Sequence, residues 1–202
     1  MDRLLQGYRR FRANVWPAER DRYEALAQQG QSPETLVIAC SDARADPQTV
    51  FGAGPGELFV VRNVSGLVPP YEPDANYHGT SAALEYGVRV LKVARIAVLG
   101  HADCGGVKAM VEGAPEEAQD FVDSWMKIAE SVMGTIPKQV GNRDILDHCE
   151  TEVVRLSLGN LRTYPWIEEA VGAGKLALNG FHFDIRTGVL AKLEGDQFVS
   201  VT

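Results

Sequence analysis

Residues 36–44 read LVIACSDAR, a short apolar run that leads straight into a cluster of reactive side chains. Further strand-like apolar runs occur at residues 58–61, 96–99 and 175–179. Continuous apolar runs of this length are typical of parallel strands that are buried on both faces of a sheet. The four runs therefore predict a mainly parallel sheet at the centre of the fold.

Helical sequence separates these runs, as connections between parallel strands require. A capped helix is predicted from Thr80 to about Lys92, and a second helix opens at residues 115–117. Strands that alternate with helices imply right-handed crossovers and an α/β fold with helices on both faces of the sheet. The tail on either side of Gly188 could add an antiparallel edge strand. Two apolar stripes have helical spacing: Phe121, Trp125, Ile128 and Val132, and then Ile145, Cys149, Val153 and Leu156.

The length and composition fit a single domain. The chain has 202 residues, of which 45% are hydrophobic, and this is enough to build one core. We expect residues 1–202 to form one domain in which residues 1–30 are an N-terminal helical arm. The arm reads as two short helices separated near Pro17.

The charge and cysteine content exclude several classes of protein. A formal net charge of -7 argues against a nucleic-acid surface, which needs concentrated Lys and Arg. No stretch approaches the ~18 apolar residues of a membrane span, and the first residues do not form a signal peptide. Three cysteines do not make a disulfide framework and suit a reducing compartment. We therefore expect a cytoplasmic protein without membrane or nucleic-acid partners.

The strongest chemical signal is the placement of Cys40, His101 and Cys104. Cys40 follows the first apolar run directly, and His101 follows the third run across Gly100. Carboxyl ends of parallel strands meet at one edge of an open sheet, where such folds bind ligands. Thiolate and imidazole are favoured zinc ligands, and three of them leave the fourth tetrahedral position open, as in catalytic sites. The sequence therefore predicts a catalytic Zn²⁺ centre.

Asp42 and Arg44 stand beside this predicted centre. Asp42 could close the zinc shell as a fourth ligand, or it could accept a hydrogen bond from bound water. Arg44 offers a planar fork that holds a carboxylate by two hydrogen bonds. Because two thiolates already neutralise Zn²⁺, we expect Asp42 to be bound to Arg44 in the active form. Ligation by Asp42 remains possible in an inactive form.

These residues resemble the β-class carbonic anhydrases. Cys-x-Asp-x-Arg and His-x-x-Cys form the zinc signature of that family, and residues 40–44 and 101–104 match it at every position. The resemblance implies reversible hydration of carbon dioxide to bicarbonate and a proton, through attack by zinc-bound hydroxide. Activity is then expected to rise toward alkaline pH. Other family-like segments lie at residues 55–63, 83–86, 105–106, 157–161 and 181–185.

The resemblance also places the chain in the plant-like subgroup with an open zinc. Val37 stands where the bicarbonate-inhibited subgroup has a Trp. The substrate-binding residues that the resemblance implies include a hydrogen-bond donor, an apolar wall and a backbone position next to the metal. They are Gln31, Phe59, Val64, Tyr86 and Gly105.

Two other functions remain open at this point. The same scaffold could hydrolyse carbon disulfide or carbonyl sulfide, or the zinc could stabilise a non-catalytic module with Asp42 closing the shell. Family members are dimers or multiples of dimers with N-terminal helices lying across the partner. The resemblance therefore implies a homodimer or tetramer, although the apolar residues of the arm would equally suit packing on the chain's own core. Those residues are Leu4, Leu5, Tyr8, Phe11 and Trp16.

Overall fold

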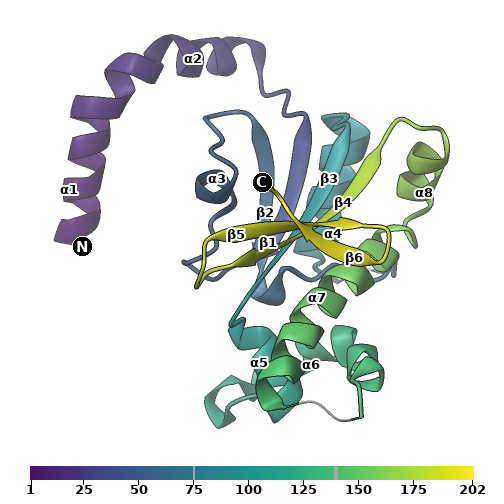
Figure 1. Cartoon of the computed structure of the whole chain (residues 1–202). Coiled ribbons are helices and arrows are strands. Elements are labelled where there is room, and N and C mark those ends of the chain that lie inside the picture. The colour runs from purple at the N-terminus through teal and green to yellow at the C-terminus, as the bar shows by residue number, and fades with distance from the viewer. Residues whose placement is uncertain (75, 139–140) are drawn as a thin grey trace.

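A six-stranded sheet forms the centre of the computed structural model, which describes residues 1–74, 76–138 and 141–202. The strand order is β2-β1-β3-β4-β5-β6 (Figure 1). The first four strands are parallel to their neighbours, and β5 and β6 form an antiparallel edge. The predicted α/β class is therefore confirmed. The strand bounds are β1 Thr35–Cys40, β2 Leu58–Asn63, β3 Arg95–His101, β4 Ala177–Asp184, β5 Val189–Glu194 and β6 Gln197–Ser200.

Strand β4 is longer than the sequence predicts and lies further along the chain. It begins at Ala177 and not at Lys175, and it continues through Phe183 and Asp184 as a strand whose residues up to Phe183 pair in parallel with β3. The prediction of an antiparallel edge on either side of Gly188 is confirmed, because Phe183 and Asp184 pair antiparallel with Leu190 and Val189 of β5. Strand β6 was not expected.

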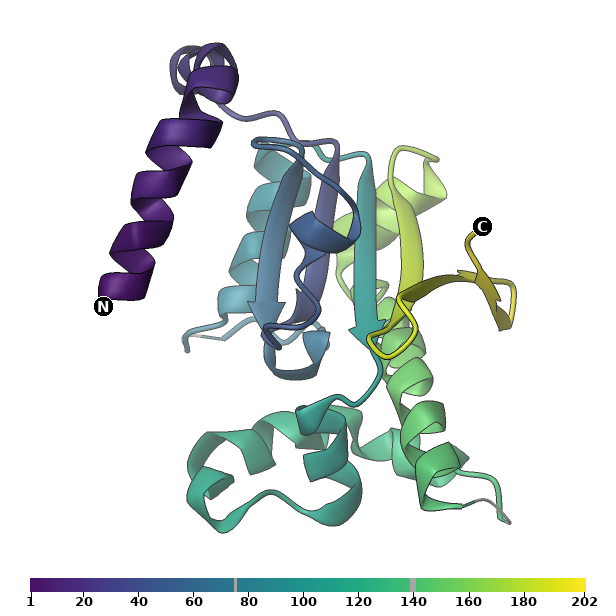
Figure 2. The same cartoon turned by 60° about the vertical axis from the view of Figure 1, so that its left-hand side comes forward.

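Helices cover both faces of the sheet, but unequally (Figure 2). Alternate β1 residues point to opposite faces, as a strand requires. Leu36 and Ile38 join the larger core with α4, α7 and α8. Val37 and Ala39 join a smaller core that α3 and β5 cover. The helix bounds are α1 Asp2–Arg10, α2 Trp16–Gln29, α3 Pro47–Val50, α4 Gly79–Glu85, α5 Gly105–Glu112, α6 Ser124–Met126, α7 Asn142–Leu161 and α8 Pro165–Gly172.

The segment between α5 and α7 differs from the predicted regular helix. It consists of short 3₁₀ and π turns around α6, over residues 116–135. Its buried side chains are Met126, Ala129 and Val132, which are spaced three residues apart. A spacing of three fits the 3₁₀ helix, in which residues i and i+3 eclipse. Phe121, expected in the core stripe, is instead 84% exposed.

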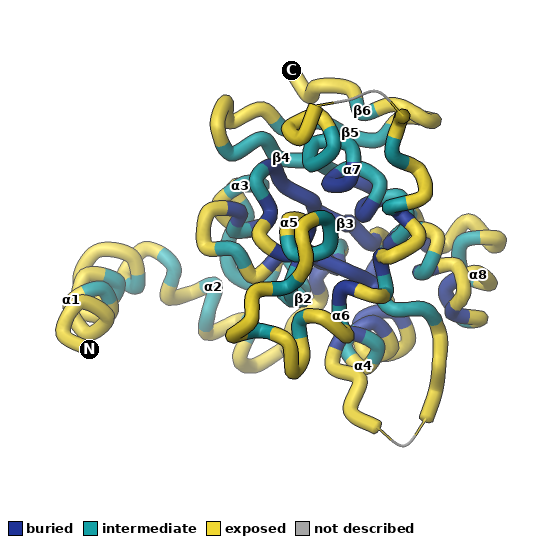
Figure 3. The backbone as a smooth tube through the Cα atoms, turned by 90° about the horizontal axis from the view of Figure 1, so that it is seen from below, coloured by how far each residue is buried: buried dark blue, intermediate teal, exposed yellow. Residues whose placement is uncertain are grey.

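The N-terminal arm projects from the rest of the chain (Figures 1 and 2). Neither α1 nor α2 has a buried residue, and no part of the arm has the dark blue of buried residues in Figure 3. The break between the helices is a π turn at Phe11–Val15, and Pro17 lies in the first turn of α2. The prediction of two helices separated near Pro17 is confirmed. The arm contacts the body through an ion pair between Arg22 and Glu57 at 2.8 Å.

Within the described ranges, no helix combines the length and the apolar character needed to cross a membrane.

Candidate metal centre

The ends of β1 and β3 bring Cys40, His101 and Cys104 together. One ligand atom from each residue lies within 4.8 Å of the others, and the two Sγ atoms are 3.9 Å apart. All three residues are buried, with 6% or less of their surface exposed. Strand register explains the meeting, because β1 and β3 are parallel neighbours whose carboxyl ends lie at the same edge.

The turn that carries His101 and Cys104 is held at both ends. The Ala102 N–H donates to the Phe183 carbonyl at 2.9 Å, which ties the turn to β4. The Cys104 N–H donates to Glu150 Oε1 on α7 at 3.0 Å. Asp103 between them has a φ of 56°, the left-handed conformation that a tight turn needs. This turn fixes the direction of two donor atoms before any metal binds.

Proton affinities in the centre favour a thiolate at Cys104. The pKa of Cys104 is lowered, first because the Cys40 thiol donates a hydrogen bond to it and also because His101 lies beside it. The pKa of Cys40 is raised, because that thiol donates its proton to Cys104 and is buried. Burial alone would lower the pKa of His101, but the adjacent Cys104 outweighs it and the pKa is raised.

The donor set fits a tetrahedral zinc ion. Two Zn–S bonds of about 2.3 Å at the tetrahedral angle place the sulfurs about 3.8 Å apart, close to the observed 3.9 Å. His101 Nδ1 lies 2.8 Å from the Ala102 carbonyl, which can only accept, so Nδ1 carries the proton. His101 Nε2 is then left with a lone pair, and it is buried without a hydrogen-bond partner among the described residues. A metal ion would satisfy this orphaned atom.

Asp42 lies beside the three donors but outside their group. Arg44 donates from Nε to Asp42 Oδ1 at 2.9 Å and from Nη2 to Oδ2 at 2.7 Å, the two-pronged contact predicted from the sequence. The Arg44 backbone N–H adds a third bond to Oδ1. These bonds, led by the side-chain contact with Arg44, hold the pKa of Asp42 well below its ordinary value. Asp42 is therefore an ionised carboxylate with a fixed orientation.

Two residues that contact the ligands were missed by the sequence analysis. Glu150 holds Cys104, as described above, and its side chain is 1% exposed. The Ser65 hydroxyl lies 3.5 Å from Cys104 Sγ. Both contacts join residues that are far apart in the chain, and neither residue type is by itself a sign of a metal centre.

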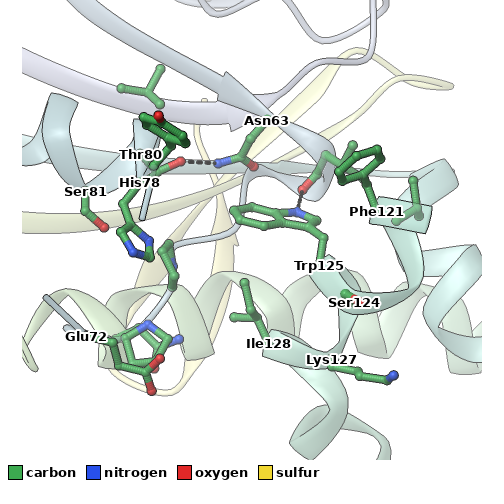
Figure 4. Close-up of a pocket in the computed structure, with 18 of the residues that line it drawn as sticks. Asn63, Glu72, His78, Thr80, Ser81, Phe121, Ser124, Trp125, Lys127 and Ile128 are labelled. Atoms are coloured by element: carbon green, nitrogen blue, oxygen red, sulfur yellow. Dashed lines mark hydrogen bonds between the residues drawn. The ribbon is translucent and has the colours of Figure 1, made fainter. Parts of the chain in front are cut away.

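An apolar pocket of about 1220 Å³ opens at the carboxyl end of β2, next to the end of β1 where Cys40 lies. Val64 lines this pocket, and its carbonyl accepts a 2.8 Å hydrogen bond from Trp125 Nε1. Figure 4 shows Trp125 and Phe121 on one side of the pocket and Asn63 and Thr80 bonded to each other above it. None of the three metal donors lines this pocket, but Asn63, which does, is the strand partner of Cys40.

The other predicted substrate-binding residues lie in two different places. Gly105 directly follows Cys104 as the first residue of α5. Gln31, Phe59 and Tyr86 lie toward the opposite end of the sheet: Gln31 precedes β1, and Phe59 pairs with Leu36. The rings of Phe59 and Tyr86 are 6.0 Å apart. Four residues of β1, about 13 Å at ~3.3 Å each, separate this end from Cys40.

The fold and donor set together define a class: an open α/β sheet with a buried Cys-His-Cys metal centre at its carboxyl edge. A family profile described as carbonic anhydrase matches residues 35–190. Beta carbonic anhydrase 3 of Arabidopsis thaliana is 35% identical over 202 residues, which is 97% of this chain and 78% of that protein. The chain belongs to the β-class carbonic anhydrase family, and it is accordingly a carbonate dehydratase.

Solved structures agree with this assignment. The β-carbonic anhydrase CcaA has a TM-score of 0.92 and 32% identity, covering 100% of this chain and 92% of that one. One of two tetrameric β-carbonic anhydrases from the ascomycete Sordaria macrospora has a TM-score of 0.83 and 26% identity, covering 100% of this chain and 98% of that one.

Proposed function

We propose that the chain hydrates carbon dioxide reversibly as a zinc enzyme, with Cys40, His101 and Cys104 as the metal ligands. Two sulfur atoms and one imidazole nitrogen are typical ligands of zinc. Hard cations such as calcium and magnesium prefer oxygen ligands. When bound, zinc would supply a Lewis acid that makes water a nucleophile near neutral pH. Three protein donors are one short of a tetrahedral shell and leave a position for that water.

One observation carries the proposal: an ionised carboxylate is fixed beside a group of three metal donors. Both Asp42 oxygens are held by Arg44, yet each carboxylate oxygen can accept more than one hydrogen bond. Asp42 therefore accepts a hydrogen bond from the attacking water. This bond orients the water so that a lone pair of the water oxygen faces the carbon of carbon dioxide. A purely structural zinc would need no such anion.

Substrate contacts follow from the surfaces around the centre. Val64 supplies apolar surface from the pocket, which suits a molecule without a dipole, and Gly105 supplies backbone next to Cys104. Gln31, Phe59 and Tyr86 are too far from Cys40 of their own chain to touch the same substrate. We infer that they serve the centre of a second copy.

A homodimer or tetramer is supported by the arm as well. Leu4 and Tyr8 are 75% and 60% exposed on a helix without buried residues, which leaves an apolar surface without a partner in its own chain. Exposed apolar surface of this kind marks an interaction site. In an oligomer this arm lies across the second copy and brings Gln31 with it.

A reducing compartment such as the cytoplasm suits the centre. Cys40 and Cys104 are free thiols whose sulfurs lie 3.9 Å apart, so an oxidant could join them and remove two of the three donors.

The proposal is tested by stopped-flow hydration of carbon dioxide at mildly alkaline pH, with zinc content measured on each sample. Asp42→Asn keeps the shape of the side chain and removes its charge, so we expect activity to fall by roughly 100-fold or more with zinc retained. Asp184→Asn is the matched control. Asp184 and Arg186 repeat the same two-pronged contact at the end of β4, outside the donor group.

Full activity in Asp42→Asn would contradict the role given to Asp42. A wild-type protein that is full of zinc and inactive toward carbon dioxide would contradict the proposed function, and carbon disulfide would then be tested as the substrate.

A further inference from the structure

Ser65 lies in the short turn that follows β2, below the metal centre. It is 4% exposed and has a φ of 67°, a left-handed conformation that residues with a side chain rarely adopt. Gly66 follows with a similar φ of 63°. A non-glycine residue in this conformation is under strain, and strain of this kind gathers at functional sites.

The Ser65 hydroxyl has two sulfur atoms within hydrogen-bonding distance. Among the described residues its hydrogen-bond partners are Cys104 Sγ at 3.5 Å and Met126 Sδ at 3.6 Å. A buried hydroxyl needs a partner for its proton, because leaving it unpaired has a free-energy cost of about 1–3 kcal/mol. Of these described partners, one of the two sulfurs must accept it.

The charge on the cysteine decides between the two sulfurs. A cysteine that binds a metal is a thiolate, which has no proton to donate and is a charged acceptor. The thioether of Met126 is a neutral and weak acceptor. Hydrogen bonds to charged acceptors are roughly twice as strong as neutral ones, so the hydroxyl donates to Cys104 once the metal is bound.

The surrounding backbone keeps this position open for the hydroxyl. A Cβ atom at Gly106 would lie 2.1 Å from Ser65 Oγ and 2.6 Å from Val64 Cγ1, so any larger residue would push Ser65 away. The close packing at Gly106 thus keeps the Ser65 hydroxyl beside the Cys104 sulfur.

We propose that Ser65 is a positioning residue of the metal centre, whose hydroxyl donates a hydrogen bond to the Cys104 thiolate and so orients that sulfur and stabilises its charged, metal-binding form. The proposal rests on metal binding at Cys40, His101 and Cys104, as proposed above. It does not depend on which substrate the metal activates.

The test compares Ser65→Ala with Ser65→Gly. Both variants remove the hydroxyl, but only glycine relieves the left-handed backbone, so a purely conformational role would move them in opposite directions. We expect both to bind zinc about 10-fold more weakly in a chelator competition, as loss of an outer hydrogen bond to a ligand typically does. Met126→Leu is the control, since it removes the other sulfur and keeps the volume.

A second measurement reports on the sulfur itself. In the Co²⁺-loaded protein, the sulfur-to-cobalt charge-transfer band should move to longer wavelength in both Ser65 variants, because an unbonded thiolate gives up an electron more easily. Met126→Leu should leave the band in place. Unshifted bands and wild-type zinc affinity in both Ser65 variants would overturn the proposal.

These readouts separate this proposal from the proposed function. A shifted cobalt band in the Ser65 variants of a protein that fails to hydrate carbon dioxide would support Ser65 and refute the reaction. A wild-type protein that hydrates carbon dioxide, with Ser65 variants whose cobalt bands do not shift, would support the reaction and refute the role of Ser65. If Ser65→Ala does not fold, Ser65→Gly still gives both measurements.

Discussion

Arg44 connects the carboxylate of the centre to the loop that carries the other ligands. Its Nη2 group donates to Asp42 Oδ2 at 2.7 Å and to the Asp103 carbonyl at 3.0 Å, so one guanidinium group spans both loops. Arg62 reinforces the first loop, because it donates to the carbonyls of Cys40 and Asp42. The ionised state of Asp42 is therefore a property of the folded loops and not of the residue alone.

Removal of the Arg44 guanidinium group should raise the pKa of Asp42. The folded-state pKa of Asp42 is depressed, so its contribution to stability is present above the unfolded value of ~3.9 and is lost as pH falls through the folded value. In Arg44→Gln we expect the pKa of Asp42 to rise toward its ordinary value, because the Arg44 side chain is the largest cause of its depression. The difference in free energy of unfolding between wild type and variant should be largest at pH 7 and should shrink as the pH falls below about 4.

A ¹³C NMR titration of the Asp42 carboxyl group checks the pKa, and urea midpoints at several pH values check the stability. Arg186→Gln, which breaks the matching contact with Asp184, should leave the Asp42 titration unchanged. An Asp42 pKa that stays low in Arg44→Gln would mean that backbone bonds alone hold the carboxylate ionised.

The meeting of the three candidate metal donors is predictable from the sequence, and the residues that support them are not. Cys40, His101 and Cys104 lie at or just after strand ends, so the rule that parallel strands end at one edge is enough to bring them together. Ser65 and Glu150 contact Cys104 only because a turn and a distant helix pack against its loop. Such contacts depend on packing between elements, which a single sequence does not reveal.

Helix α7 and strand β3 meet more closely than side chains would normally allow, and Gly100 is the reason. A Cβ atom there would lie 2.5 Å from Val154 Cγ2 and 3.4 Å from the Glu150 carbonyl. This close contact brings Glu150 within reach of Cys104. The packing of one helix against one strand thus sets the position of a metal ligand.

Two glycine substitutions with opposite expected effects test this packing. Gly100→Ala should destabilise the protein by about 1–3 kcal/mol, because the extra methyl group overpacks the contact between α7 and β3. Gly159→Ala, on α7, meets nothing within 4 Å and should stabilise the protein by roughly 0.5 kcal/mol. Urea denaturation of both variants measures the difference. Equal stability of the two would show that α7 can move away from β3 at no cost.

The predicted elements were right where the apolar pattern was uninterrupted. Strand β4 extended past its prediction because Asn179, Gly180 and His182 break its apolar run while its backbone still pairs with β3. The segment at residues 116–135 was wrongly predicted as a regular helix, because a spacing of three resembles a spacing of 3.6 over a few turns.

The whole molecule has two features that a single copy of the chain does not explain. No residue of helices α1 and α2 is buried, and three of the predicted substrate-binding residues lie far from the candidate metal centre of their own chain. The fold class follows from strands that alternate with helices, whereas the proposed use of Gln31, Phe59 and Tyr86 in substrate binding requires a second copy of the chain. The sequence of one chain carries no direct signal for where that copy lies.

Disrupting the apolar face of the arm should separate the copies. In a Leu4→Ser, Tyr8→Ser double variant we expect dissociation toward monomers, because both side chains lose apolar surface that would be buried between copies. Sedimentation velocity measures the assembly, and circular dichroism shows whether the body stays folded. Hydration activity should fall together with the assembled fraction. An active monomer would rule out a contribution of the second copy to the centre.

The meeting of β1 and β3 at the candidate metal centre makes metal binding depend on folding, because the three donors come together only in the folded sheet. Cys40 and Cys104 are 64 residues apart in the chain, and β2 lies between their strands in sequence but not in space. In the unfolded chain, closing a loop of that length costs roughly 4 kcal/mol of entropy, so the unfolded chain is a poor chelator. Metal held by these donors would bind the folded chain selectively and stabilise it by mass action, by an amount that grows with the logarithm of the free metal concentration. On this proposal, scarce metal leaves more chains in the unfolded state that proteases cut, so the amount of folded enzyme should follow the metal supply.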